Sequence, residues 1–175
     1  MRMTDHLPSA PPALPAETVK VACLRVGQEY YALDIMCIRE IIRPLPIVPV
    51  PRAPAFVEGV VNLRKAIIPV VDLRRRFGLE PATLDETKRR IVICAIDGRI
   101  VGLLADEVTE VYSCNQADMR PTPYYLSGPE ADFFPGVCSK GNDLMLLLDL
   151  RSLLATAEQV DLNQIRKHIG SAPER

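Results

Sequence analysis

The sequence has no tryptophan and only two histidines in 175 residues. His6 lies in a proline-rich N-terminal stretch and His168 lies near the C-terminus, so neither is placed to act as a general base or a metal ligand. The cysteines do not cluster with the histidines, and a transition-metal site is therefore not expected. The sequence predicts a protein without a metal or other cofactor.

Motifs for nucleotide binding and nucleophilic catalysis are also missing. The chain contains no G-x-G-x-x-G, no Walker-type loop and no G-x-S-x-G. Adjacent carboxylates such as Asp106–Glu107 and Asp85–Glu86 are more often solvated faces than catalytic pairs. We therefore expect no enzymatic activity, and a small nucleotide-binding module remains a much less favoured alternative.

Neither sign of charge prevails. The chain has 21 Lys and Arg against 22 Asp and Glu, for a net charge of -1. This balance gives no general attraction to nucleic acid or to an anionic membrane. No apolar run approaches the ~18 residues of a membrane span, and no basic segment followed by an apolar one opens the sequence. We expect a cytoplasmic protein without direct membrane insertion.

The five cysteines are odd in number, widely spaced and free of any C-x-x-C pair. Four lie in apolar surroundings, where a thiol behaves as a small buried hydrophobe. Cys114, in the polar context YSCNQ, is expected to be more exposed. For a cytoplasmic protein this usage predicts reduced thiols. The residues concerned are Cys23, Cys37, Cys94, Cys114 and Cys138.

Short apolar runs rich in Val, Ile and Leu begin at Val19 and are separated by turn residues. VKVACLRV and EYYALDI flank Gly27-Gln28, which predicts a β-hairpin. RRIVICAI and RIVGLLA flank Asp97-Gly98, a stronger hairpin signal because Asp-Gly tolerates the positive φ angles of a tight turn. DLMLLLDL follows Gly141-Asn142 and reads as another strand. The fold is predicted to be mainly β.

Predicted helices are few and short. One covers Ile35–Ile42, with apolar residues at helical spacing on one face. Others follow Asp72 and Asp149, because an aspartate caps the first turn of a helix. A terminal helix is expected in DLNQIRKHIG, residues 161–170.

The sequence also contains an internal repeat. Gly59-Val60 precedes Asp72-Leu73-Arg74 as Gly136-Val137 precedes Asp149-Leu150-Arg151, with an offset of 136 − 59 = 77 residues. Upstream, Tyr31-Ala32-Leu33 matches Val101-Gly102-Leu103 at an offset of 70. This repeat predicts two similar β modules, each made of a hairpin, a turn or short helix, and two more strands.

The run GVVNLRKAIIPVVDLRRRFG, residues 59–78, concentrates five cations. Its arginines could grip nucleic acid, but nine Tyr and Phe residues in all supply no evident stacking platform. The simpler interpretation of RRRF is the solvated face of a short helix, with Leu73 and Phe77 turned inward. Residues 62–64 are absent from the second copy, which has Ser139-Lys140-Gly141 there, so we expect function at this turn.

Protein binding is the favoured function. Arg64 in the turn and Glu40 in the segment IREI would supply charged specificity elements to a partly apolar groove between two barrels. The apolar candidates for this groove are Ile38, Ile41 and Val61. An ordinary pair of exposed charges, worth at most ~1 kcal/mol, is an equally good interpretation from the pattern alone.

The same run, preceded by PRAPAFVE, resembles the signature stretch of the CheW family of chemotaxis coupling proteins. The similarity extends from about Val19 to Leu154 and includes EYYALDIMCIREI, RIVGLLADEVTEV, ADMRP and LMLLLDLRSLL. It implies a CheW-like fold of two tandem five-stranded β barrels around a shared apolar core. The implied organisation is a flexible Pro-rich tail (1–17), an adaptor domain (18–157) and a C-terminal helix and tail (158–175).

The resemblance implies a non-enzymatic scaffold that links the cytoplasmic tip of methyl-accepting chemoreceptors to the regulatory domain of a CheA-type histidine kinase, recruited to membrane-associated arrays. We expect a monomer or a weakly self-associating protein that does not bind nucleic acid. The residues implied in receptor binding are Glu40, Arg64, Ile38, Gly59, Asn62 and Leu63. Those implied in kinase binding are Val101, Leu103, Val108 and Tyr125.

The chain departs from the family pattern at Lys65, where a glycine usually follows N-L-R. If this turn requires positive φ, the lysine costs roughly 1 kcal/mol. The departure leaves open which partners the protein selects. A CheW-like adaptor of a non-swimming pathway, serving surface motility or a second-messenger output, is the alternative function.

Overall fold

The computed structural model describes residues 17–81, 83, 85–123 and 129–155. The predicted terminal helix at 161–170, Tyr125 and most of the predicted Pro-rich tail lie outside the described residues. Most of the described chain is β-strand, as predicted. The strands are β1 Thr18–Val26, β2 Glu29–Asp34, β3 Ile38–Ile42, β4 Val57–Leu63, β5 Ala66–Asp72, β6 Arg90–Ile96, β7 Arg99–Ala105, β8 Glu107–Asn115, β9 Met119–Pro121, β10 Gly136–Lys140 and β11 Asp143–Leu147.

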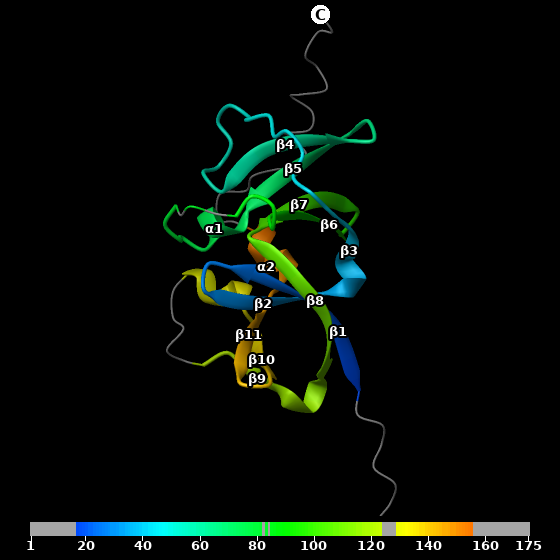
Figure 1. Ribbon diagram of the computed structural model, residues 1–175, viewed down its shortest axis with the longest axis vertical. Helices are drawn as coiled ribbons and strands as arrows, with labels where there is room; N and C mark the ends of the chain where they lie inside the picture. Colours follow the sequence, from blue (N-terminus) through cyan, green and yellow to red (C-terminus); the bar gives the residue numbers. More distant parts are fainter. Residues whose placement is uncertain (1–16, 82, 84, 124–128, 156–175) are drawn as a thin grey trace, which may run out of the picture.

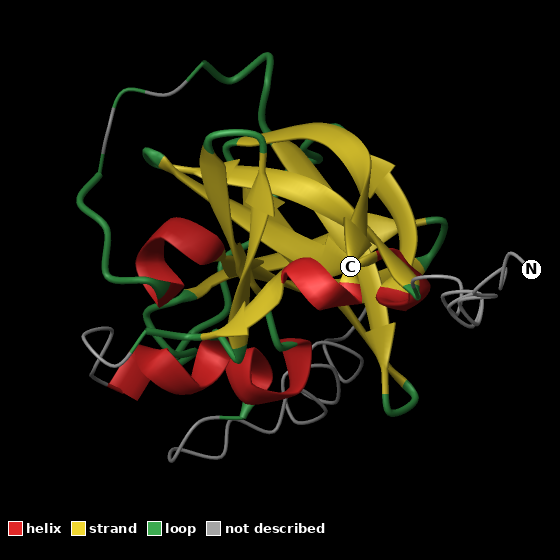
Figure 2. Cartoon of the chain, turned by 90° about the horizontal axis from the view of Figure 1, so that it is seen from below, coloured by secondary structure: helices red, strands yellow, loops and turns green. Residues whose placement is uncertain are grey.

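The strands form two sheets, which Figure 1 shows stacked along the long axis of the molecule. One has the order β3-β6-β7-β5-β4 and the other β8-β1-β2-β11-β10-β9. The predicted pair of five-stranded barrels is therefore present, and the three-residue β9 adds a sixth strand to the second. Figure 2 shows the sheets curling around their interiors with the helical turns on one side.

The two halves of the sequence repeat exchange their hairpins. The hairpin β6–β7 from the second half lies in one sheet with β3, β4 and β5, and the hairpin β1–β2 from the first half lies with β8, β10 and β11. The joining contacts are equivalent, because β5 pairs with β7 in parallel and β11 pairs with β2 in parallel. Each barrel thus contains strands of both repeats, and neither repeat supplies a complete barrel.

Both predicted hairpin turns are present. Asp97 and Gly98 have φ angles of 49° and 73° between β6 and β7, which is the backbone that Asp-Gly favours. Gly27 has a φ of 64° between β1 and β2. These turns set the register that places alternate side chains in the core.

The predicted helix over Ile35–Ile42 is wrong. Only η1, Ile35–Cys37, is helical, as one 3-10 turn capped by the Asp34 side chain, which accepts a hydrogen bond from Met36 N. The rest is β3, which pairs with β6. The branched isoleucines at 38, 41 and 42 suit a strand, and pairing with β6 provides backbone hydrogen bonds that an isolated short helix would not gain.

A shared apolar core lies between the barrels, as predicted. Buried side chains from both sheets meet there with Phe133 and Phe134, and a smaller cluster fills each barrel. Tyr31 stacks on Phe77 with ring centroids 4.7 Å apart, and both rings contact Phe134. Because strands of both sheets contribute side chains to this core, the core joins the two barrels.

The short helices begin where the capping aspartates predicted them. Asp72 accepts from Arg74 N at the start of α1, Leu73–Arg76, and Asp149 accepts from Arg151 N at the start of α2, Leu150–Leu154. η2, Gln116–Asp118, and η3, Pro129–Phe133, complete the helical turns of the described chain.

Only Arg75 of RRRF is exposed, so the predicted solvated face is corrected for Arg74 and Arg76. Arg74 pairs with the buried Asp106 at 2.6 Å, and Arg75 pairs with Glu58 at 3.0 Å. Arg76 lies over the rings of Phe56 and Phe133 at 4.4 and 4.3 Å. The inward position of Leu73 and Phe77 is confirmed. Arg74 and Arg76 are thus held at the junction of the barrels, and Arg75 is ion-paired within its own barrel, so the three guanidiniums do not form an unpaired basic patch.

Each barrel is closed where a crossing segment passes over a glycine of the repeat. Val48 forms a two-hydrogen-bond bridge with Val60 beside Gly59, and a Cβ at Gly59 would overlap the Val48 backbone. At the equivalent Gly136, a Cβ would lie 2.7 Å from the carbonyl oxygen of Arg120 on β9. These two repeated glycines are therefore closure points of the fold.

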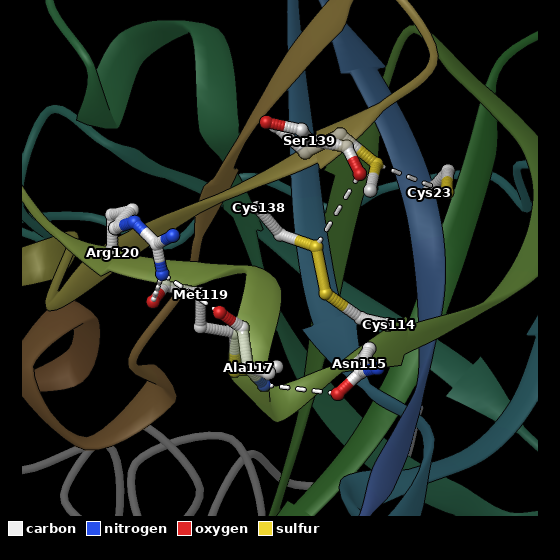
Figure 3. The surroundings of a disulfide bond; sticks show 9 residues. Cys23, Cys114, Asn115, Ala117, Met119, Arg120, Cys138 and Ser139 are labelled. Atoms are coloured by element: carbon white, nitrogen blue, oxygen red, sulfur yellow. Dashed lines mark hydrogen bonds between the residues drawn. A yellow bond between two sulfur atoms is a disulfide. The ribbon is translucent and has the colours of Figure 1, made fainter. Parts of the chain in front are cut away.

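The prediction of five reduced thiols is wrong for two of them. Cys114, at the end of β8, forms a disulfide with Cys138 on β10, and both are buried (Figure 3). The expected exposure of Cys114 is also incorrect, because its side chain points into the second barrel beside Val21 and Met145. Cys23, Cys37 and Cys94 remain free.

Candidate functional site: an ion-paired turn and an interbarrel groove

The turn unique to the first repeat joins β4 to β5. Arg64 and Lys65 have φ angles of 50° and 69°, the double positive-φ geometry of a tight two-residue hairpin loop. The Asn62 Oδ1 accepts a hydrogen bond from Lys65 N at 3.0 Å. Asn62, predicted as a binding residue, thus fixes the turn that displays Arg64.

Arg64 and Glu40 form a bidentate ion pair. Arg64 Nη1 donates to Glu40 Oε1 at 2.5 Å, and Nη2 donates to Oε2 at 3.0 Å. Hydrogen bonding from Arg64 lowers the pKa of Glu40, and the same contact raises the pKa of Arg64. Because β3 and β4 are opposite edges of the five-stranded sheet, this pair joins the two edges as the barrel closes. The side chain of Arg64 is 72% exposed and that of Glu40 is 29% exposed.

The other predicted receptor-binding residues lie deeper. Gly59 is buried under the Val48 backbone, Leu63 packs partly against the interior of its barrel, and Ile38 packs against the shared core. Val61 is 1% exposed and cannot line a groove, whereas Ile41 is exposed at the surface. The structure therefore brings Glu40 and Arg64 to one surface and gives the remaining residues supporting positions.

Two of the predicted kinase-binding residues are in the core. Val101 and Leu103 lie on β7, between β6 and β5, and are 1% and 0% exposed. A partner cannot contact their side chains in this fold, so the prediction is corrected for both. Val108 is half-buried against the shared core. The apolar pattern of the strand was visible in the sequence, but its central place in a sheet was not.

Sequence reasoning missed a groove of about 530 Å³ between the barrels. Its walls come from the end of β2 with η1, from the β6–β7 turn, and from the start of α2. Met36 stands beside it with 86% of its surface exposed. The lining residues are Leu33, Asp34, Met36, Cys37, Ala95, Ile96, Asp97, Leu148, Asp149, Leu150 and Arg151.

The sequence repeat explains why this groove is open. Offsets of 70 and 77 residues match Met36 to Asp106 and Arg151 to Arg74. In the equivalent place, Asp106 accepts hydrogen bonds from Arg74 Nη1 at 2.6 Å and from Gly27 N at 2.7 Å, and that ion pair fills the seam. Met36 carries no such charge, and Arg151 instead pairs with Asp97 at 3.0 Å. The difference between Met36 and Asp106 at matched positions of the repeat is the sequence signal that could have predicted the groove.

The protein has a CheW-like fold. Its two β barrels exchange hairpins around one apolar core, and an ion-paired turn closes one of them. The CheW-like domain family model matches residues 20–158. The chain is 34% identical to chemotaxis protein CheW of Treponema pallidum over 158 residues, covering 89% of this chain and 93% of that protein. The chain belongs to the CheW family.

Further comparisons agree. Chemotaxis protein CheW of Rhizobium meliloti is 36% identical over 141 residues, which cover 80% of this chain and 90% of that protein. The crystal structure of the scaffolding protein TtCheW from Thermoanaerobacter tengcongensis superposes with a TM-score of 0.73 at 30% identity, covering 81% of this chain and 95% of that one. Among the described residues, no helix is both long and apolar enough to cross a membrane.

Proposed function

We propose that this protein is a non-enzymatic adaptor that couples methyl-accepting chemoreceptors to a CheA-type histidine kinase in a bacterial chemosensory array. The observation that carries the proposal is membership of the CheW family over residues 20–158, with a fold shared with a protein described as a scaffold. The proposed location is the cytoplasm, at membrane-associated receptor arrays.

The ion-paired turn supports a receptor-binding role. A guanidinium has five N–H donors, and Glu40 engages two nitrogens of Arg64 from one side. The exposed remainder can donate to carboxylates or carbonyls of a partner. Glu40 holds the side chain in one orientation, which reduces the entropy lost when a partner binds. Ile41 and the interbarrel groove offer apolar contact area on the same molecule.

A kinase-binding surface on the second barrel is supported by other residues than those first predicted. Two large apolar side chains of this barrel are exposed, Val111 on β8 and Leu144 on β11, whereas the exposed Ile100 lies on β7 in the first barrel. Exposed apolar side chains are where a partner gains most from desolvation. Val108 and Tyr125 remain predictions for this surface.

Charge reversal tests the receptor site. We expect Arg64→Glu to abolish capture of the protein by a soluble chemoreceptor signalling fragment, because it places two carboxylates together and removes the exposed donors. Circular dichroism should show an intact β fold. Arg75→Glu is the matched control, since Arg75 also forms an exposed ion pair, with Glu58, at the other end of β5.

The double exchange Glu40→Arg with Arg64→Glu separates recognition from folding. It restores an ion pair between the barrel edges but reverses the charge presented by the turn. If Arg64 recognises the receptor, the double variant still fails to bind. Full binding by either Arg64→Glu or the double variant would contradict the assignment of this site.

A further inference from the structure

The β4–β5 turn differs from the other tight hairpin turns of the described chain. Three of these two-residue turns contain a glycine at positive φ, which is the residue such turns favour. The β4–β5 turn has no glycine, although φ is positive at both of its residues, 50° at Arg64 and 69° at Lys65. It thus carries two long side chains on a backbone that disfavours them. The four turns are Gly27-Gln28, Arg64-Lys65, Asp97-Gly98 and Gly141-Asn142.

Other turns of the same protein show which residues suit this backbone. The β6–β7 turn has the same double positive-φ geometry and is made of Asp97-Gly98. The matching turn of the second repeat, at the offset of 77 residues, is Gly141-Asn142. The geometry of the β4–β5 turn therefore does not by itself explain a lysine at position 65. Backbone strain at an exposed position indicates that the side chain has a role beyond the fold.

Arg64 has a contact within the fold that accounts for its presence, whereas Lys65 does not. The Arg64 guanidinium binds both carboxylate oxygens of Glu40 and so joins the edges of the sheet. The Asn62 side chain accepts from the backbone N–H of Lys65, which fixes the turn without using the lysine side chain. Within the part of the chain that the structure describes, the Lys65 ammonium forms no ion pair or hydrogen bond, and the residue is exposed. The lysine side chain is therefore available to a partner.

Lys65 also sets the charge of the surface around the turn. Glu40 and Arg64 neutralise each other, and Lys65 adds one positive charge, so the sum is −1 + 1 + 1 = +1. Arg64 keeps N–H groups that can donate to a partner, but the uncompensated cation is Lys65. The group that complements such a cation is a carboxylate.

We propose that Lys65 is a specificity-determining residue of the receptor-binding turn, which selects chemoreceptors that place an aspartate or glutamate opposite it. This inference rests on the proposed adaptor function. Arg64 supplies hydrogen bonds in a fixed orientation, and Lys65 supplies an ion pair that discriminates between receptors. A receptor with a lysine or arginine at the facing position is disfavoured by like-charge repulsion.

Two substitutions separate the charge of Lys65 from its backbone conformation. Lys65→Gln removes the charge but keeps a long side chain on the same backbone, and Lys65→Arg keeps the charge. Binding to a soluble chemoreceptor signalling fragment from the same genome is measured by titration calorimetry. We expect about fivefold weaker binding by Lys65→Gln, the effect of one exposed ion pair, and unchanged binding by Lys65→Arg. The affinity of Lys65→Gln should also fall less steeply with added salt.

Lys88→Gln is the matched control, because it removes an exposed cation from a turn before β6 and should bind like the original chain. Lys65→Gly excludes a folding defect. It removes the charge and also relieves the positive-φ strain, so weaker binding by this variant cannot come from a strained turn. We expect Lys65→Gly to bind about as weakly as Lys65→Gln.

Double-mutant cycles locate the carboxylate on the receptor. Each Asp and Glu at the tip of the fragment is changed to its amide, and binding is measured with the original chain and with Lys65→Gln. We expect one receptor residue whose change weakens binding to the original chain but not to Lys65→Gln. Additive effects at every acidic residue would overturn the proposed ion pair.

The binding data also distinguish this inference from the proposed function. Equal binding by the original chain and Lys65→Gln, or equally weak binding by Lys65→Gln and Lys65→Arg, would overturn the role of the Lys65 charge and leave the adaptor function intact. Absence of binding by the original chain would refute the proposed function itself, and the inference with it.

Discussion

Lys65 has an unfavourable backbone conformation in the β4–β5 turn, which a hydrogen bond partly offsets. The resemblance to the CheW family predicts glycine at this position, and the φ of 69° lies in the left-handed region that costs a residue with a Cβ about 1 kcal/mol. Asn62 offsets part of this cost through its hydrogen bond to the Lys65 amide. The lysine side chain adds an exposed cation beside Arg64.

We predict that Lys65→Gly stabilises the protein. Relief of the positive-φ strain should exceed the larger unfolded-state entropy of glycine, for a net gain of about 0.5 kcal/mol in the free energy of unfolding. Urea denaturation followed by circular dichroism measures the change. Lys88→Gly is the control, because Lys88 is exposed in a turn where no positive φ is recorded, and it should not stabilise. A less stable Lys65→Gly would contradict this account of the turn.

At the scale of single elements, the sequence predicted hairpins well and the segment after β2 badly. Gly27 and Asp97-Gly98 supply backbone freedom that only tight turns require, so the signal is local and strong. Residues 35–42 satisfy both helical and strand patterns, because so short an apolar run cannot separate the two periods. Pairing with β6, a long-range contact, decides between them.

The Cys114–Cys138 disulfide could not be predicted from spacing either. The two residues are 24 apart in sequence and meet because the second barrel brings the end of β8 against β10. In Figure 3 the bond crosses between these strands, with Cys23 on a neighbouring strand. It closes the loop that contains η2, β9 and η3.

We predict that losing this disulfide costs about 3 kcal/mol in the free energy of unfolding, the value expected for closing a loop of this length. The test is denaturation with and without reductant for the original chain and for Cys114→Ser with Cys138→Ser. Reductant should destabilise the original chain but not the double variant. Cys37→Ser, which keeps the disulfide, should respond to reductant like the original chain. Equal stability of the original chain with and without reductant would contradict the prediction.

At the scale of the whole molecule, the sequence repeat predicted two similar units but not the exchange of hairpins between them. Offsets of 70 and 77 residues report similarity between strands, whereas pairing partners depend on which hairpin the other repeat supplies. The interlocking makes the barrels one mechanical unit, because each sheet loses strands if the other half unfolds. An adaptor that holds two partners at a fixed geometry benefits from such rigidity.

The candidate site was recoverable from sequence only in part. Glu40 and Arg64 could be named because the turn differs between the repeat copies and matches the family signature, and the structure brings them into one ion pair. The groove needed three distant segments to be placed together, so no local pattern revealed it. Val101 and Leu103 were misassigned because an apolar strand reads alike in the core and at an interface.

Reconstitution with chemoreceptors and kinase measures most directly whether the protein couples the two. Autophosphorylation of a CheA-type kinase is followed with chemoreceptor-containing vesicles, with and without this protein, and with Arg64→Glu or Arg75→Glu in its place. The account predicts that receptor control of the kinase appears only when the protein is added, persists with Arg75→Glu and is lost with Arg64→Glu. Receptor control that does not depend on the protein, or that Arg64→Glu supports fully, would contradict it.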